Sequence, residues 1–155
     1  MSRVEATIEV DVPVATVYNQ WTQFEEFPRF MEGIKEVRQL DDKTLVWTAE
    51  ISGKEETWQA EISEQEPDQR ITWHSTAGRQ LAGGVFFERL GDSRTRVRLE
   101  MKWEPEGVIE KAGDLLRFDE RQIKGDLERF KEFIESRGTA SGAWRGEINE
   151  GERVR

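Results

Sequence analysis

The stretch that decides the fold is Pro105 to Arg137, which reads PEGVIEKAGDLLRFDERQIKGDLERFKEFIESR. Four apolar residues in its second half are spaced by four, three and four positions: Ile123, Leu127, Phe130 and Ile134. This spacing repeats one face of a helix, and charged residues occupy the opposite face. The stretch therefore predicts a long amphipathic helix whose apolar face packs against the rest of the chain.

The residues before this helix predict a sheet. Residues 3–11 alternate between apolar and polar side chains, which is typical of a half-buried strand. Pro13 suits the first position of a helix, and Pro28 indicates a break into a second short helix. Six further strands are predicted, at residues 34–40, 44–51, 55–65, 70–76, 81–90 and 95–103. Short turns join them, so consecutive strands should pair antiparallel.

A sheet with one apolar face needs an element to cover that face. The predicted fold is therefore α+β: a strongly curved seven-stranded antiparallel sheet wrapped around a long C-terminal helix, with two short helices after the first strand. We expect one domain over residues 1–137 and a flexible tail over 138–155, which is polar and has no helical or strand period. Trp144 in this tail either lies on the surface or docks on its own domain or on a second subunit.

Composition excludes several classes of function. The 155 residues include no cysteine and one histidine, which removes thiolate sites and His-rich metal sites, so we expect no metal and no fixed cofactor. No apolar run approaches the ~18 residues of a membrane span, and no signal peptide is recognisable, which predicts a soluble, cytoplasmic protein. The net charge of −9 argues against nucleic acid as a partner. Arg94, Arg96 and Arg98 share one side of a strand, where they either pair with an acidic strand or offer a phosphate site.

Aromatic residues point to a cavity. The chain has six tryptophans and one tyrosine, and tryptophans line pockets for flat or apolar ligands as well as filling cores. The inward side of the strands carries Trp47, Trp58, Trp73, Phe87 and Trp103, and the facing part of the helix carries Leu115, Leu116 and Asp119. We predict that these residues line a ligand site. The alternative is that they pack tightly and leave no pocket.

Candidates for proton transfer are few. His74 follows the inward Trp73, so it should point to the outer face and take no part in catalysis. Asp119 and Glu120 continue the apolar line of the helix backward, which places them either on the cavity wall or at its rim. Tyr18 is a further hydrogen-bonding candidate. None of these lies in a nucleophile motif, so no catalytic residue is assigned.

Glycines mark two places of interest. The pair Gly83 and Gly84 indicates either strong strand curvature or a close approach to the backbone. Gly113 lies inside the predicted helix, where it indicates either a bend or the joint between a short helix and the long one.

Two segments resemble a known family. Residues 17–31, VYNQWTQFEEFPRFM, resemble the start of polyketide cyclase/dehydrase-type proteins, in which an aromatic-rich segment with Phe-Pro follows the first helix. Residues 125–134, GDLERFKEFI, resemble the terminal helix of that family. The resemblance covers residues 3–137 and implies the helix-grip fold of the START-like (SRPBCC) superfamily. Many members carry or sense hydrophobic molecules, a few are enzymes, and coenzyme-Q-binding proteins form a related branch.

The expected function is the binding of a hydrophobic small molecule (lipid, polyketide-like or quinone-like) between the sheet and the terminal helix. The first alternative is a cyclase or dehydratase that uses the same cavity, with Asp119, Glu120 or Tyr18 moving protons. The second alternative is a protein-interaction module with a vestigial pocket. We expect a monomer or a homodimer.

Overall fold

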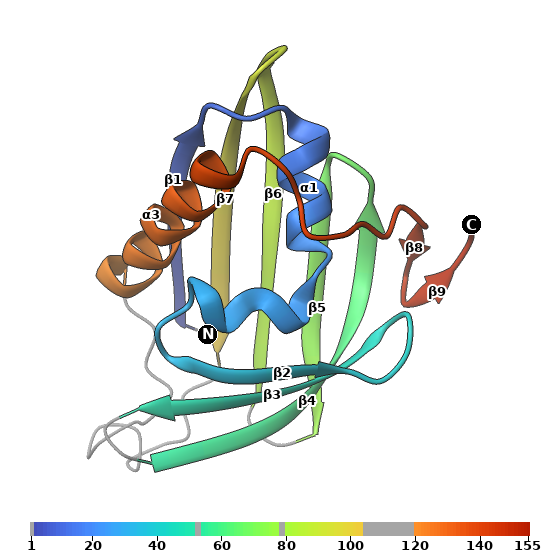
Figure 1. Cartoon of the computed structure of the whole chain (residues 1–155). Coiled ribbons are helices and arrows are strands. Elements are labelled where there is room, and N and C mark those ends of the chain that lie inside the picture. The colour runs from blue at the N-terminus through green and yellow to red at the C-terminus, as the bar shows by residue number, and fades with distance from the viewer. Residues whose placement is uncertain (1, 52–53, 78–79, 104–119) are drawn as a thin grey trace.

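The structure is a computed structural model that describes residues 2–51, 54–77, 80–103 and 120–155 (Figure 1). Its helices are α1 (Val14–Trp21), the 3-10 helix η1 (Phe24–Arg29) and α3 (Glu120–Arg137). Its longer strands are β1 (Ser2–Val10), β2 (Ile34–Gln39), β3 (Thr44–Ile51), β4 (Lys54–Glu66), β5 (Arg70–Ala77), β6 (Leu81–Gly91) and β7 (Arg94–Trp103). Two short strands, β8 (Ile148–Asn149) and β9 (Glu152–Arg153), follow α3.

The longer strands form one antiparallel sheet in the order β1-β7-β6-β5-β4-β3-β2. Each strand from β2 to β6 pairs with the next along the chain, and β1 pairs with β7. In Figure 1, β5, β6 and β7 stand upright while β2 and β3 run across their lower ends, so the sheet bends strongly along the long strand β4. The predicted helix-grip architecture is confirmed, with β8 and β9 as additions among the described residues.

Alternation of side chains explains which face of the sheet is covered. In β3, Leu45, Trp47 and Ala49 are buried on the concave side, and the residues between them are more exposed. On the convex side the arginine stripe pairs with acidic residues of neighbouring strands. Arg94 and Arg96 reach Glu9 at 2.6 and 3.4 Å, and other ion pairs continue the row. The stripe is therefore a paired outer face, the first of its two predicted roles.

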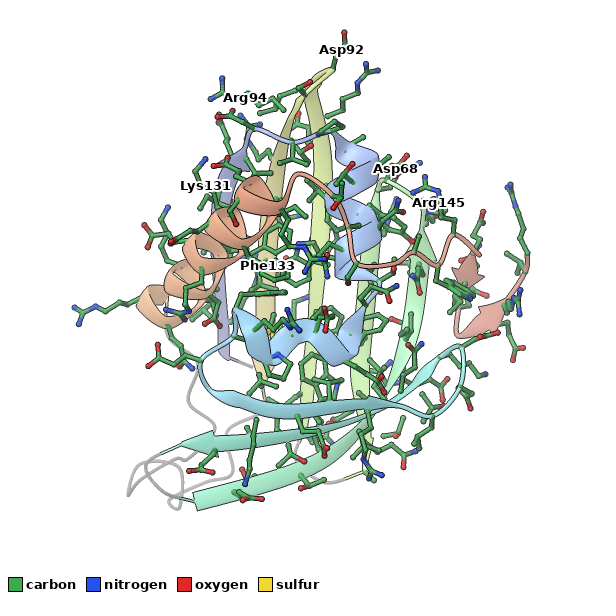
Figure 2. All side chains as sticks on the ribbon, viewed as in Figure 1. Asp68, Asp92, Arg94, Lys131, Phe133 and Arg145 are labelled. Atoms are coloured by element: carbon green, nitrogen blue, oxygen red, sulfur yellow. The ribbon has the colours of Figure 1, made fainter. Side chains whose placement is uncertain are left out.

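Helix α3 covers the concave face as its spacing predicts. Its four regularly spaced apolar residues are all buried at 1% exposure or less. Lys131, on the outer side, donates to the Glu9 carbonyl oxygen at 2.9 Å and so holds the helix to β1. Figure 2 shows Phe133 directed toward the centre of the molecule and Lys131 directed away from it. The predicted first half of the long helix, up to residue 119 and including Gly113, lies outside the described residues.

Aromatic rings fill the space between the helices and the sheet. Trp21 of α1 contacts Phe27, Phe30 and Phe130 with ring centroids 5.0 to 5.3 Å apart. The Phe-Pro segment forms η1 and brings its phenylalanines to this cluster, so the same segment that carries the family resemblance also builds the core. Because α1 and η1 cover the concave face together with α3, the sheet encloses three helical elements among the described residues rather than one.

The C-terminal residues 138–155 lie against the domain. The chain turns at Gly138, whose φ of +72° is a conformation that favours glycine. It then runs along α1 to β4, where Ile148 pairs with Gln65 and is fully buried. Figure 2 shows Arg145 beside Asp68, and an ion pair of 2.9 Å joins them. The mobility expected for this segment stays a prediction.

Trp144 docks on its own domain. Its backbone N–H donates to the Thr22 hydroxyl at 3.1 Å, its ring packs at the edge of the core, and the Arg153 guanidinium lies 5.5 Å from the ring centroid. Of the alternatives that the sequence left open, docking on its own domain is the one observed.

As for membrane insertion, none of the helices within the described ranges is both long enough and apolar enough to span a bilayer.

Candidate functional site between the sheet and helix α3

A small cavity lies between the concave face of the sheet and α3. It encloses about 30 Å³, room for about two water molecules. Residues from seven elements and from the loop after η1 line it: Met31, Gly33, Ile34, Trp47, Ala49, Trp58, Trp73, Leu81, Leu99, Met101, Gln122, Ile123 and Asp126. The sheet side is apolar, while the polar lining residues Gln122 and Asp126 both belong to α3.

Three tryptophans form one wall. Trp47 and Trp58 are direct cross-strand partners in β3 and β4, and their rings stack with centroids 6.0 Å apart and planes 5° apart. Trp73 of β5 also stacks on Trp47, with centroids 5.8 Å apart and planes 30° apart. All three are at most 4% exposed. Inward parity on adjacent antiparallel strands brings the rings together, because opposite residues face the same side of a sheet.

Among the described residues, Asp126 is the acidic one that lines this cavity. It is 7% exposed, and its Oδ1 accepts hydrogen bonds from the Arg129 guanidinium and from the Glu32 backbone N–H, the latter at 3.3 Å. Burial raises the pKa of the Asp126 carboxyl above its ordinary value, and the pairing with Arg129 opposes that effect. The structure thus keeps a carboxyl group of raised pKa on the wall of an apolar cavity.

Arg129 ties the same part of α3 to the loop that closes the cavity. Its Nε donates to the Phe30 carbonyl oxygen at 3.0 Å, and its Nη1 lies 3.3 Å from the Glu32 carboxylate. The loop contributes Met31 and Gly33 to the lining. Asp126 and Arg129 together therefore fix the position of one wall of the cavity relative to α3.

The structure brings some of the predicted site residues together and not others. Trp47, Trp58 and Trp73 meet at the cavity. Phe87 is also buried on the inner face, but its ring packs edge-on against Tyr18 of α1, with centroids 5.4 Å apart, and it does not line this cavity. Trp103 ends β7, and its side chain lies outside the described residues. Leu115, Leu116 and Asp119 also lie outside them, as does the side chain of Glu120.

The other proton-transfer candidates lie away from the cavity. His74 is exposed on the outer face, as strand parity predicts. Tyr18 of α1 is fully buried, and burial raises its pKa to about 12, an effect that Gln65 and Arg145 partly oppose. Its phenol therefore stays neutral at physiological pH. Within the described residues, no group of three or more His, Asp or Glu side chains is placed to hold a metal ion.

Sequence reasoning missed Asp126 although a signal was present. Asp126 stands three positions after Ile123 and four before Phe130, on the apolar line of the helix. A carboxylate on that line is costly to bury, so its presence there points to a special environment. Met31 and Met101 were missed as lining residues because parity and helical spacing show which side is buried and not where packing is loose.

Comparisons with known proteins agree with this architecture. An uncharacterised 17.2 kDa protein of Streptomyces lincolnensis, from the melC2-rnhH intergenic region, is 51% identical over 149 residues, covering 96% of this chain and 99% of that protein. The Zhui aromatase/cyclase from Streptomyces sp. R1128 superposes with a TM-score of 0.72 at 16% identity, covering 92% of this chain and 99% of that one. A START superfamily protein from Mycobacterium smegmatis gives 0.69 at 17% identity, covering 86% and 97%.

The two structural likenesses show the fold alone, because their sequence identities are low. The family itself rests on a match along the sequence. The model of the family described as polyketide cyclase/dehydrase and lipid transport matches residues 10–132, which include α1, the aromatic segment and most of α3. The fold and the family support a cavity for hydrophobic ligands, and the chain belongs to the polyketide cyclase/dehydrase and lipid-transport family.

Proposed function

We propose that this protein binds a flat, largely apolar small molecule between the tryptophan wall and α3, with Asp126 orienting the polar end of the ligand. The observation that carries the proposal is the wall itself: stacked Trp47 and Trp58, with Trp73 beside them, face a largely apolar cavity. Aromatic faces of this kind bury a large apolar area, and burial contributes about 25 cal/mol for each Å² removed from water.

The size of the cavity sets a condition on binding. Sites for small molecules typically measure about 300–1,000 Å³, whereas the lining residues here enclose about 30 Å³. Side chains of the lining must therefore move when a ligand enters. Met31 and Met101 are suited to this, because an unbranched thioether side chain adapts its shape at low cost. The proposed site opens by displacement of these side chains, with α3 and the sheet as the fixed frame.

The first experiment looks for a ligand without assuming its identity. Native mass spectrometry and solvent extraction of the purified protein should reveal a retained apolar compound. In parallel, titration with the neutral naphthalene dye prodan should show saturable binding with a blue shift in emission. A wild-type protein that carries no compound and binds no prodan would overturn the proposal.

Two tryptophan variants test where the ligand lies. Trp73→Ala should weaken prodan binding by about tenfold or more, since a large ring is lost from the wall. Trp144→Ala is the matched control, because Trp144 lies in the C-terminal segment and does not line the cavity. Its affinity for prodan should match the wild type. Equal binding by wild type and Trp73→Ala would show that the ligand lies elsewhere.

One observation also favours the enzyme alternative. A carboxyl of raised pKa on the wall of an apolar cavity is suited to general acid or base catalysis. The variant Asp126→Asn separates the two functions. If the protein only binds, wild type and variant retain the same compound in different amounts. If it is a cyclase or dehydratase, the variant accumulates a compound that the wild type converts.

A further inference from the structure

The floor of the proposed site contains a glycine that no side chain could replace without movement. Gly83 stands in the interior of β6, directly opposite Trp73 in β5 and opposite Met101 in β7. A Cβ atom at Gly83 would lie 2.9 Å from Cζ2 of Trp73 and 2.9 Å from Sδ of Met101. Both neighbours line the cavity. Of the two meanings predicted for this glycine pair, close approach to the backbone is therefore the one that the contacts support.

The neighbouring glycine shows the same crowding on the opposite face. A Cβ atom at Gly84 would lie 3.0 Å from two ring atoms of Phe86 and 3.1 Å from the Thr72 methyl carbon. Because successive residues of a strand face opposite sides, the two glycines crowd different surfaces. Gly83 makes room on the cavity side, and Gly84 makes room on the outer side.

We propose that Gly83 determines the depth of the ligand site, by letting Trp73 and Met101 lie low over the backbone of β6. The inference rests on the proposed function. Ordinary contact begins at 3.4 Å, so a Cβ at Gly83 reaches it only when both side chains move by about 0.5 Å. The backbone of β6 is paired on both sides and does not yield easily. The displacement is therefore directed into the cavity.

A displacement of this size is large relative to the site. The cavity holds about 30 Å³, and Trp73 and Met101 both line it on the strands beside β6. Moving both inward leaves a ligand less depth between the tryptophan wall and α3. Gly83 thereby admits ligands that need the full depth of the site, and a side chain at this position selects against them.

Three alanine variants in the same strand test the inference. Gly83→Ala should weaken prodan binding by about tenfold to a hundredfold, as the cost of overpacking implies. Gly84→Ala introduces similar crowding on the outer face and should bind prodan within about twofold of wild type. Gly91→Ala should also be unchanged, because a Cβ there meets nothing within 4 Å.

A second measurement needs no ligand. Stacked indoles give an exciton signal in circular dichroism, which depends on the mutual orientation of Trp47, Trp58 and Trp73. Gly83→Ala should change that signal, while Gly84→Ala and Gly91→Ala should preserve it. A merely structural role for Gly83 would lower stability without this spectral change or the loss of binding.

A fourth variant covers the case in which Gly83→Ala does not fold. Met101→Ala removes one of the two side chains that lie over Gly83, and it should deepen the site and accept bulkier naphthalene dyes than wild type. If wild type binds prodan, and Gly83→Ala and Met101→Ala bind it as well as wild type does, the inference is wrong and the proposed function stands. If wild type does not bind prodan, the proposed function is wrong. In that case an unaltered exciton signal in Gly83→Ala would be enough to show that Gly83 does not position the tryptophans.

Discussion

Replacing Asp126 should make the protein more stable while weakening its proposed function. Asp126 is 7% exposed and lines an apolar cavity, so burial of its carboxylate opposes folding. The direction of its pKa shows which effect dominates. Burial raises the pKa of Asp126 despite the pairing with Arg129, which means that the carboxylate is less favourable in the folded protein than in the unfolded chain.

The size of the change in the free energy of unfolding depends on whether Arg129 keeps its other partners after the substitution. Replacing a buried ion pair with apolar residues is often neutral or stabilising, by about 1–4 kcal/mol. Here Arg129 would not be stranded, because it is 39% exposed and keeps the Glu32 carboxylate at 3.3 Å and the Phe30 carbonyl oxygen at 3.0 Å. We therefore expect Asp126→Leu to raise the free energy of unfolding by about 1–2 kcal/mol at neutral pH, and Asp126→Asn by up to about 1 kcal/mol.

The pH dependence provides the sharper test. An aspartate whose folded pKa lies above its unfolded value contributes stability below the unfolded pKa, about 3.9, and loses that contribution as pH rises through the folded pKa. The advantage of Asp126→Leu over wild type should therefore be full at neutral pH. It should shrink as pH falls through the raised pKa of Asp126, because wild type then becomes neutral at this position too.

Urea unfolding followed by far-ultraviolet circular dichroism measures these differences at several pH values. Glu128→Gln is the matched control, since Glu128 is an exposed carboxylate on the outer side of the same helix. Its effect should stay within about 0.5 kcal/mol. If both Asp126 variants lower the free energy of unfolding by more than about 1 kcal/mol at neutral pH, the pairing with Arg129 outweighs burial and the reasoning is wrong.

Three further outcomes test other parts of the structure. Thr95→Val should lower the free energy of unfolding by about 1–3 kcal/mol in urea titrations, because the buried Thr95 hydroxyl donates to the Val12 carbonyl oxygen at 2.7 Å. Ile148→Ala removes a buried side chain, which costs about 2–5 kcal/mol of stability. The substitution should speed hydrogen–deuterium exchange in residues 139–155 and leave that of α3 unchanged. Asp41→Asn should lower the melting temperature at neutral pH, and the difference should fade in acid. Hydrogen bonds from two backbone amides and a hydroxyl lower the pKa of Asp41, so its contribution is lost as pH falls through the folded pKa.

The sequence was enough to predict the fold because the signals were local and periodic. Alternation in β3 and β7 fixed which residues face inward, and the spacing of Ile123 to Ile134 fixed the packing face of α3. Short turns then left a meander as the simplest topology. The resemblance to the polyketide cyclase/dehydrase family pointed to the same architecture from residues 17–31 and 125–134.

The site was harder to predict because cavities depend on small differences in packing. Parity placed Phe87 and Trp73 on the same face, yet α1 covers Phe87 and leaves Trp73 at the cavity. The C-terminal segment has no period because individual contacts hold it, such as the hydrogen bonds between Ser141 and Gln20 at 2.9 and 3.0 Å. Interactions of this kind leave no repeating pattern in a sequence.

The features around the cavity argue against a core packed for stability alone. A glycine inside a central strand costs conformational entropy, and a buried carboxylate costs solvation free energy. Methionines specify a core less sharply than branched residues do. Gly83, Asp126, Met31 and Met101 bring all of these costs to one small space, whereas the neighbouring cluster around Trp21 is built from closely packed aromatic rings. Local departures from good packing concentrate at functional sites, where selection accepts a loss of stability. Their convergence beside the tryptophan wall therefore favours a working ligand site over a vestigial one.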